Sequence, residues 1–226
     1  MKLSIILPVY NEANTVYEIL KTLFYYSYRV KHIQKVIVVN DGSTDGSKEI
    51  MDSIKKLDYA DKFRIIHLEK NRGKGNAVRE AFKYASGDYV MLLDADLIRL
   101  KESHLDSLRK CAINNDMVIG LRDKNKIQNK VMPYFPLTGG ERMIRTELLR
   151  DILGLRLSDG WGLEAVMNDY CKKRKMKVAT ILLKGLDHIG LQTKKYGWMA
   201  FLKECYDVIL VKIKLIGVDY SDIPHN

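Results

Sequence analysis

The sequence has few cysteines and no long apolar run. Its three cysteines, Cys111, Cys171 and Cys205, are isolated in a chain of 226 residues and show no C-x-x-C spacing. This pattern argues against a disulfide framework or a zinc site and fits a reducing cytoplasm. No uninterrupted apolar stretch is long enough to cross a bilayer. The apolar run Leu3–Leu7 lacks a signal-peptide cleavage site, so we expect a first strand there.

The glycine-rich loops of common nucleotide-binding folds are also absent. A dinucleotide-binding domain needs such a loop directly after its first strand, and residues 8–12, PVYNE, contain no glycine. Gly73 and Gly75 are followed by Val78 where a third glycine would be required, and the sequence contains no P-loop. The first turn also lacks the glycine and arginine that a nucleotidyltransferase would place near a triphosphate. These three classes are therefore excluded.

Acidic residues are fewer than basic ones, 28 against 38, which gives a net charge of +10 and a pI near 9.3. This balance predicts an anionic partner. We exclude nucleic acid, because no helix combines base-reading residues with a basic stripe and no RNA-binding platform of aromatic and basic residues occurs. A nucleotide sugar, a lipid phosphate or the anionic face of a membrane would each satisfy the charge.

Strand-like and helix-like segments alternate through the first hundred residues. Buried strands are predicted at Leu3–Val9, Val36–Val39, Phe63–Leu68 and Tyr89–Leu93, and helices at Glu12–Tyr26, Lys48–Leu57 and Gly75–Tyr84. Asn11 is the expected cap of the first helix, and Ser43 or Thr44 that of the second. Short connections between alternating elements predict an α/β fold with a doubly wound, mostly parallel sheet flanked by helices.

The pattern is less regular after Leu100. We expect helices at Lys101–Ile113, Glu147–Leu153 and Gly160–Lys175, strands at Met117–Gly120 and Val178–Leu183, a mobile loop at Arg122–Lys130 and an apolar helix at Trp198–Ile216. The last helix could rest on an anionic membrane, but we favour packing on the sheet, because its spacing suggests a buried stripe through Trp198, Phe201, Cys205 and Ile209. One continuous domain is predicted, with residues 1–100 binding the nucleotide and residues 101–226 the acceptor.

Two carboxylates, Asp94 and Asp96, end the fourth predicted strand. In an extended segment they point to the same side, at the edge where open parallel sheets bind ligands. Two anions held this close need a positive partner, such as a divalent cation that carries a nucleotide diphosphate. The alternative is a strand-end turn in which each aspartate only accepts backbone hydrogen bonds.

Three further motifs precede this acidic pair. They are residues 6–12 (ILPVYNE), 38–46 (VVNDGSTDG) and 71–77 (NRGKGNA). In order and spacing, these motifs and the Asp94-Ala95-Asp96 triplet resemble glycosyltransferase family 2 with its GT-A fold. The resemblance covers the first half of the chain strongly. One departure is Asn40, where the family usually has a first aspartate, whereas Asp41 is kept.

The resemblance implies a metal-dependent enzyme that uses a nucleotide-diphosphate sugar, with a UDP-sugar favoured. The implied nucleotide-binding residues are Pro8, Tyr10, Glu12, Asp41, Arg72, Lys74, Asp94 and Ala95. Asp41 would accept the imide N–H of uracil, Pro8 and Glu12 would line the ribose, and Arg72 or Lys74 would meet the base or diphosphate. Asp96 would bind Mn²⁺ or Mg²⁺, which neutralises the departing diphosphate.

The second half supplies the predicted second metal ligand and a base. Related enzymes complete the metal site with a late histidine, and His188 after the last predicted strand fits that role; the alternative is an ordinary loop histidine. Asp96 and Glu164 are the predicted catalytic residues, with Glu164 as the base of an inverting transfer. Asp159 and Asp169 are its rivals. A glycine-containing turn at Thr138–Arg142 is expected on the acceptor side.

The acceptor is expected to be a saccharide, a lipid phosphate or a small phosphorylated compound. A sugar hydroxyl needs a base during attack, whereas a phosphate is already anionic. The chain also has some likeness to polyprenyl-phosphate sugar transferases and to retaining phosphoglycerate glycosyltransferases. Inverting transfer is favoured, and the alternatives are retaining transfer and a non-catalytic GT-A module that binds a nucleotide. The expected location is the cytoplasm or the inner face of the membrane.

Overall fold

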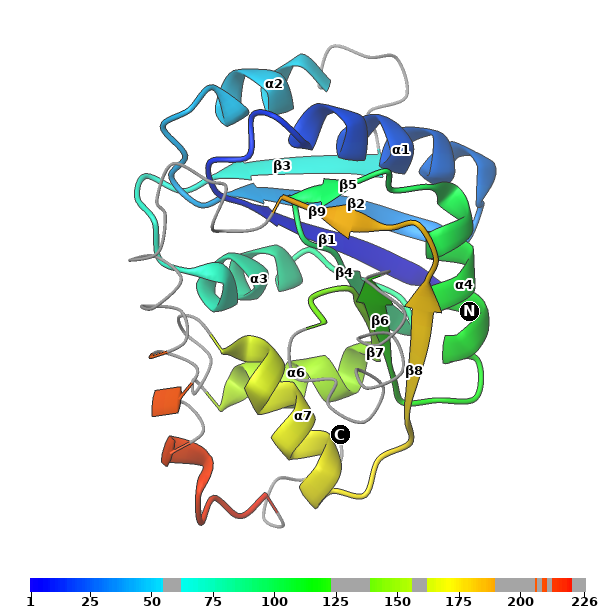
Figure 1. Cartoon of the computed structure of the whole chain (residues 1–226), viewed down its shortest axis with the longest axis vertical. Helices are drawn as coiled ribbons and strands as arrows, with labels where there is room; N and C mark the ends of the chain where they lie inside the picture. The colour runs from blue at the N-terminus through cyan, green and yellow to red at the C-terminus, as the bar shows by residue number, and fades with distance from the viewer. Residues whose placement is uncertain are drawn as a thin grey trace.

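The computed structural model describes residues 1–54, 62–122, 139–155, 162–189, 206, 209–210 and 213–220. Within these residues, seven strands form one mixed sheet in the order β3-β2-β1-β4-β7-β6-β8 (Figure 1). Its strands are β1 (Leu3–Val9), β2 (Ile33–Asn40), β3 (Phe63–His67), β4 (Tyr89–Leu92), β6 (Met117–Arg122), β7 (Arg142–Arg145) and β8 (Val178–Leu183). Strand β7 runs antiparallel to its neighbours β4 and β6, and the other neighbouring pairs are parallel.

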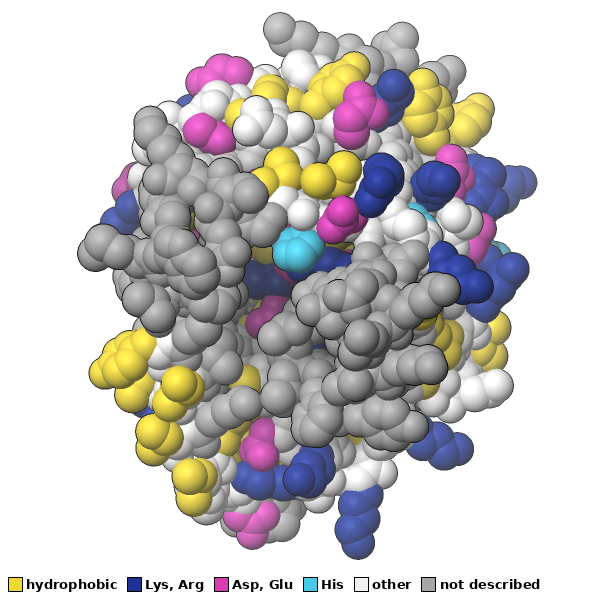
Figure 2. All heavy atoms as spheres, in the orientation of Figure 1, with side chains coloured by type: hydrophobic (Ala, Val, Ile, Leu, Met, Phe, Trp, Pro, Cys, Tyr) yellow, Lys and Arg dark blue, Asp and Glu magenta, His cyan; other side chains and the backbone are white. Residues whose placement is uncertain are grey.

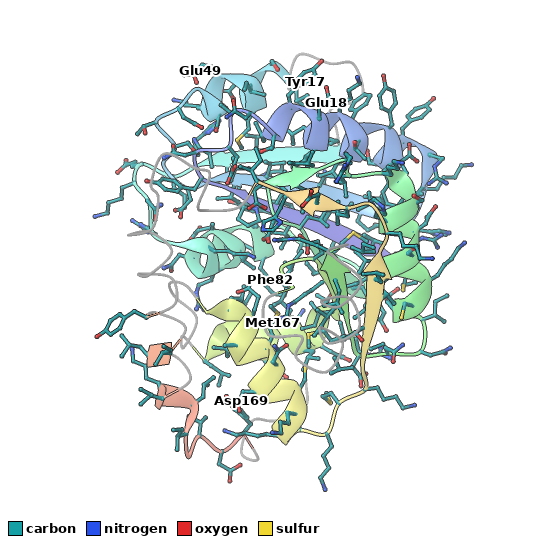
Figure 3. The ribbon with its side chains drawn as sticks, in the orientation of Figure 1. Tyr17, Glu18, Glu49, Phe82, Met167 and Asp169 are labelled. Atoms are coloured by element: carbon teal, nitrogen blue, oxygen red, sulfur yellow. The ribbon has the colours of Figure 1, made fainter. Side chains whose placement is uncertain are left out.

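Helices cover both faces of this sheet (Figure 1). One apolar cluster joins the sheet to α1 (Val16–Arg29), α2 (Ser47–Ile54) and α4 (Glu102–Ala112). The other joins it to α3 (Lys74–Phe82), α6 (Thr146–Gly154) and α7 (Leu163–Lys173). Phe82 of α3 and Met167 of α7, which Figure 3 labels, both belong to this second cluster. Burial on both faces explains why β1 and β4 are almost continuously apolar.

Helix α1 begins at Val16 rather than at Glu12, and Asn11 is not its cap. Asn11 takes a left-handed conformation with φ of 55° and accepts a 2.8 Å hydrogen bond from the backbone N–H of Thr44. Thr15 lies at the cap position, and its hydroxyl donates to the carbonyl of Ala95 at 2.5 Å. The segment before α1 is therefore a loop that contacts two other loops, which sequence periodicity does not reveal.

Helix α2 begins at Ser47, so Ser43 and Thr44 do not start it. The carboxylate of Asp45 accepts hydrogen bonds from the backbone N–H of Ser47 at 3.1 Å and from its hydroxyl at 2.6 Å. The Ser43 hydroxyl instead accepts from the backbone N–H of Asn11. Asp45 thus supplies the capping interaction that we predicted for Ser43 or Thr44.

The second half contains strands that the sequence did not suggest. Strand β7 replaces the end of the predicted turn, and Arg122 ends β6 instead of starting a loop. Two short strands, β5 (Leu97–Ile98) and β9 (Asp187–His188), pair antiparallel in a second small sheet. Residues 123–138 and 156–161, which include the rest of the predicted loop and turn, Asp159 and Trp161, lie outside the described residues.

The predicted helix at Trp198–Ile216 is described only in part, and residues 206, 209–210 and 213–215 are helical. The side chain of Ile209 is 54% exposed, so the prediction that it packs on the sheet is wrong. Leu215 and Tyr220 are buried and join the cluster that includes α6 and α7. No helix within the described residues is both long and apolar enough to span a bilayer.

Candidate active site

Three loops meet at the edge where parallel strands β1, β2 and β4 end. Asp41 donates its backbone N–H to the carbonyl of Val9 at 2.8 Å, and Leu93 donates to that of Ile6 at 3.1 Å. The hydrogen bond from Thr15 to Ala95 connects the loop after β1 to the loop after β4. The carboxyl ends of adjacent parallel strands thus bring the predicted motifs to one edge of the sheet.

Asp41 is only 3% exposed and fixes the loop after β3. One carboxylate oxygen accepts from the backbone N–H of Arg72 and the other from that of Gly73, both at 2.8 Å. Burial raises the pKa of Asp41, although both backbone hydrogen bonds oppose this effect. Gly42 must be glycine, because a Cβ there would lie 2.6 Å from the backbone of Lys70 and of Asn71. The two loops therefore hold a carboxylate whose oxygens each keep a second lone pair.

A buried charge cluster lies beside Asp94. We define it as Lys74, Asp94, Arg122, Glu141 and Glu164, whose side chains are all at most 20% exposed. Lys74 contacts Asp94 at 2.5 Å and also donates to Glu164, while Arg122 contacts Asp94 and lies 2.9 Å from Glu141. Lys74 comes from the start of α3, Arg122 from the end of β6 and Glu164 from the first turn of α7.

A group in the charge cluster stays charged where the attraction of oppositely charged neighbours outweighs the effect of burial, which favours the neutral form. Burial is the largest single effect on Glu164 and opposes its ionisation, but the attraction of Lys74 and Arg142 and the hydrogen bond from Lys74 together outweigh it, so the pKa of Glu164 lies below its usual value. Burial likewise opposes the charge on Lys74, and Asp94 with Glu164 raises the pKa of that amine. For Glu141 burial has the larger effect and raises the pKa of the carboxyl, despite the attraction of Arg122.

His188 lies next to Asp96. Pairing of β5 with β9 sets Leu97 opposite His188, and the backbone N–H of Ile189 donates to the carbonyl of Asp96 at 3.0 Å. The side chains of Asp96 and His188 are 17% and 26% exposed, although Oδ1 of Asp96 and Nδ1 of His188 are themselves buried. Figure 2 shows basic and acidic side chains within a hollow below β9. Residues from the first and second halves of the chain thus meet at this edge.

Two polar ligands at this edge fit a divalent cation. The carboxylate of Asp96 is a hard oxygen donor and the imidazole of His188 a nitrogen donor, a combination that Mn²⁺ accepts. Among the described residues, no three His, Cys, Asp or Glu side chains gather closely enough to hold a metal. Cations that carry a nucleotide typically take only one or two protein ligands, with phosphate and water oxygens completing the set.

The remaining predicted site residues surround this edge or lie away from it. Pro8 is partly buried in β1, Tyr10 is 38% exposed, and the backbone N–H of Glu12 donates to the Ser47 hydroxyl. Asp169 pairs with Lys173 at 2.9 Å and with Tyr220, at the far part of α7 (Figure 3). It therefore lies outside the charge cluster and is not a rival of Glu164.

Sequence reasoning missed Arg122 and the partner of Glu141. Arg122 follows the apolar residues 117–121 directly, so its place at a strand end was the available signal. Glu141 is fully buried against Arg122, a pairing between residues far apart in the chain. Lys74, which we expected at the base or diphosphate, lies between two carboxylates.

Residues 4–170 match the family model of glycosyl transferase family 2. The chain belongs to this family. Ninety-six residues are 43% identical to the poly-beta-1,6-N-acetyl-D-glucosamine synthase of Staphylococcus epidermidis, a match that covers 42% of this chain. The same length is 40% identical to the Staphylococcus aureus (strain MW2) synthase. The matched segment spans 22% of the length of either relative.

Solved structures share the whole fold. Glucosyl-3-phosphoglycerate synthase from Mycobacterium tuberculosis in complex with Mn²⁺, UDP and phosphoglyceric acid superposes with a TM-score of 0.73 and 20% identity, covering 97% of this chain and 80% of that one. Its complex with Mn²⁺, UDP-glucose and phosphoglyceric acid gives 0.74 over 97% and 81%. The predicted α/β fold class and the family resemblance are confirmed.

Proposed function

We propose that this family 2 protein transfers a sugar from a UDP-sugar to a phosphate-bearing or hydroxyl acceptor with the help of Mn²⁺ or Mg²⁺. The observation that supports the proposal most directly is the pairing of β5 with β9, which sets His188 opposite Leu97, the residue that follows Asp96. Asp41 lies at the same edge of the sheet, where β2 ends. Structural neighbours with this fold were solved with UDP, UDP-glucose and either Mn²⁺ or Mg²⁺, which supports the choice of donor and cation.

The uracil base would bind at Asp41. Its two oxygens already accept backbone hydrogen bonds, and a remaining lone pair would accept the imide N–H of uracil. Cytosine offers no proton at that position, so the carboxylate favours uracil. The surrounding nucleotide-binding residues in this proposal are Pro8, Tyr10, Glu12, Arg72 and Ala95.

The cation would bind Asp96 and His188. When bound, it would neutralise the diphosphate that leaves the sugar carbon. Asp94 serves a different purpose in this proposal, because both of its oxygens contact cationic side chains of the charge cluster. Lys74 and Arg122 orient Asp94 toward the ribose, and the cluster keeps bulk water from that side of the donor.

The acceptor that best fits the charge cluster carries a phosphate. Glu164 is a weak base, because Lys74 contacts its carboxylate and the pKa of that carboxyl group is lowered. A weak base suits a phosphate oxygen as the attacking group better than a hydroxyl, which must lose its proton during attack. Structures of the neighbouring synthase hold phosphoglyceric acid or glycerol 3-phosphate, which supports a small phosphorylated acceptor but not the choice between these two attacking groups. A lipid phosphate would require membrane contact, and the inverting course with Glu164 as base stays a prediction.

Binding of UDP with and without Mn²⁺ tests this proposal by calorimetry. We expect Mn²⁺ to increase UDP affinity, Asp96→Asn to abolish that increase and His188→Ala to reduce it about tenfold or more. His32→Ala, which removes an exposed histidine outside the site, is the matched control and should change nothing. UDP affinity that is independent of Mn²⁺, or that is equal in all three variants, would refute the metal site.

A further inference from the structure

One face of the C-terminal helical segment is apolar and exposed. Tyr206, Ile209, Ile213 and Ile216 are 60%, 54%, 57% and 79% exposed. Tyr206, Ile209 and Ile213 are helical positions whose spacing of three and four residues is typical of one side of a helix, and Ile216 lies in the turn that follows. Leu215 points the other way and is 4% exposed. We call these four residues the apolar stripe. The segment is thus docked by one side while its largest apolar side chains face solvent.

Buried contacts fix this segment to α7. Tyr220 packs on Tyr170 with ring centroids 4.8 Å apart, and its hydroxyl donates to Asp169 at 3.0 Å. Lys173 donates to the backbone carbonyls of Leu215 and Val218, both at 2.9 Å. The orientation of the apolar stripe is therefore set by the core and by α7, and Figure 1 shows the segment alongside this helix.

Exposed basic side chains lie at the end of the helix that this segment contacts, after it, and in the segment itself. Lys172 and Lys175 at the end of α7, Lys177 before β8 and Lys214 in the C-terminal segment are exposed. Figure 2 shows hydrophobic side chains gathered at the lower left of the molecule and basic ones along its lower edge. Among the residues that the structure describes in α7 and the C-terminal segment, Asp169 is ion-paired with Lys173, and the four exposed lysines outnumber the exposed Asp219.

We propose that the apolar stripe and these four lysines dock the protein onto an anionic membrane surface. Apolar side chains of an amphipathic helix enter the boundary between headgroups and acyl chains, and lysines attract anionic lipids; stable attachment generally needs both signals. A second copy of the chain is a poorer occupant, because a symmetric contact would set the lysines of one copy against those of the other. The proposal concerns location and is independent of the sugar-transfer chemistry.

Vesicle flotation without any nucleotide tests the docking surface. The protein should float with vesicles of phosphatidylcholine mixed with phosphatidylglycerol and not with phosphatidylcholine alone, and high salt should weaken the interaction. Ile213→Ser should reduce the partition coefficient about tenfold or more. Lys172→Gln should reduce it about fivefold.

Matched controls come from the end of α4. Ile113→Ser alters an isoleucine that is 60% exposed, and Lys110→Gln removes an exposed lysine, so each control matches one test variant in exposure or charge. Flotation of both controls should equal that of the wild type. Thermal melting of every variant verifies folding, and UDP binding should be the same in all of them.

Three results would overturn the proposal. Equal flotation with neutral vesicles would show that the lysines play no part. Equal losses in the test and control variants would mean that binding follows net charge rather than this surface. In the third result, light scattering finds that the wild type is a dimer, that Ile213→Ser dissociates it and that the dimer does not float. This result would assign the apolar stripe to a second copy of the chain.

Discussion

Gly140 leaves no space for a side chain next to the carboxylate of Asp94. A Cβ at this position would lie 2.0 Å from one oxygen of Asp94, 2.6 Å from the other and 2.5 Å from the carbon between them. To regain an ordinary contact of about 3.4 Å, the carboxylate or the backbone must move by roughly 1.4 Å. Asp94 cannot turn away without breaking its contacts with Lys74 and Arg122.

We therefore predict that Gly140→Ala impairs both stability and activity. Overpacking of this kind costs about 1–3 kcal/mol, which urea denaturation would measure as a lower midpoint. A displacement of about 1 Å at a positioned group lowers a reaction rate about 100-fold. The assay is the rate of UDP-sugar transfer, or of slow hydrolysis to free UDP, in the presence of Mn²⁺.

Gly154→Ala is the control for Gly140→Ala. Gly154 ends helix α6 and does not take a positive φ. A Cβ at this position would have no other atom within 4 Å. Its substitution should keep full activity and leave stability unchanged or slightly higher. The reasoning fails if Gly140→Ala retains the wild-type urea midpoint and rate. Lost stability with a normal rate would show that Gly140 serves the fold and not the position of Asp94.

The remaining predictions concern buried charge and base recognition. Lys74→Met leaves Asp94 and Glu164 without their shared cation and should lower the unfolding free energy by about 3–5 kcal/mol, whereas Lys70→Met at an exposed site should change it by less than about 0.5. Because the pKa of Glu164 is lowered, its ionised form stabilises the fold above the usual value of about 4.3, and this stabilisation disappears as the pH falls through the lowered pKa. Urea denaturation between pH 6 and about pH 3 should therefore show a smaller acid loss for Glu164→Gln than for the wild type. Asp41→Asn should weaken UDP binding about tenfold and reduce the ratio of UDP affinity to CDP affinity. The physical reason is that an amide nitrogen cannot accept the hydrogen bond from the backbone N–H of Gly73. Calorimetry measures both affinities. Equal UDP and CDP affinities in the wild type would contradict the role of Asp41.

Strands buried on both faces were predictable from the sequence. Strand β1 begins and ends at the predicted residues, because a parallel strand covered by helices needs a continuous apolar run. Strand β8 also has its predicted bounds, although it lies at the edge of the sheet and most of its residues are partly or fully exposed. Strand β7 carries two arginines in four residues and gives no such signal. Arg142 is fully buried there only because Gly139 and Asn168, from other segments, accept its hydrogen bonds.

The sequence could place several predicted residues at one edge of the sheet where motifs follow strand ends. Asp41, Asp94 and Asp96 could be placed together because parallel strands end at one edge. The charge cluster could not be predicted, since Lys74 pairs with Glu164 across 90 positions and Arg122 with Asp94 across 28. Ion pairs between distant segments leave no periodic pattern in the sequence, and the same lysine could equally have faced a diphosphate.

The structure gives Asp94 and Asp96 different surroundings. Asp94 is held by Lys74 and Arg122 and rests against Gly140. If Asp94 left these cations to bind a metal, the buried positive charge of Lys74 and Arg122 would be uncompensated. Asp96 lies 4.0 Å from Arg122, and the residue after it pairs with His188, so Asp96 is the aspartate that we propose as the metal ligand. Rigid positioning and exchangeable ligation are conflicting demands on one carboxylate. In the proposed function, a pair of aspartates two residues apart meets both demands, because their different neighbours give them different partners.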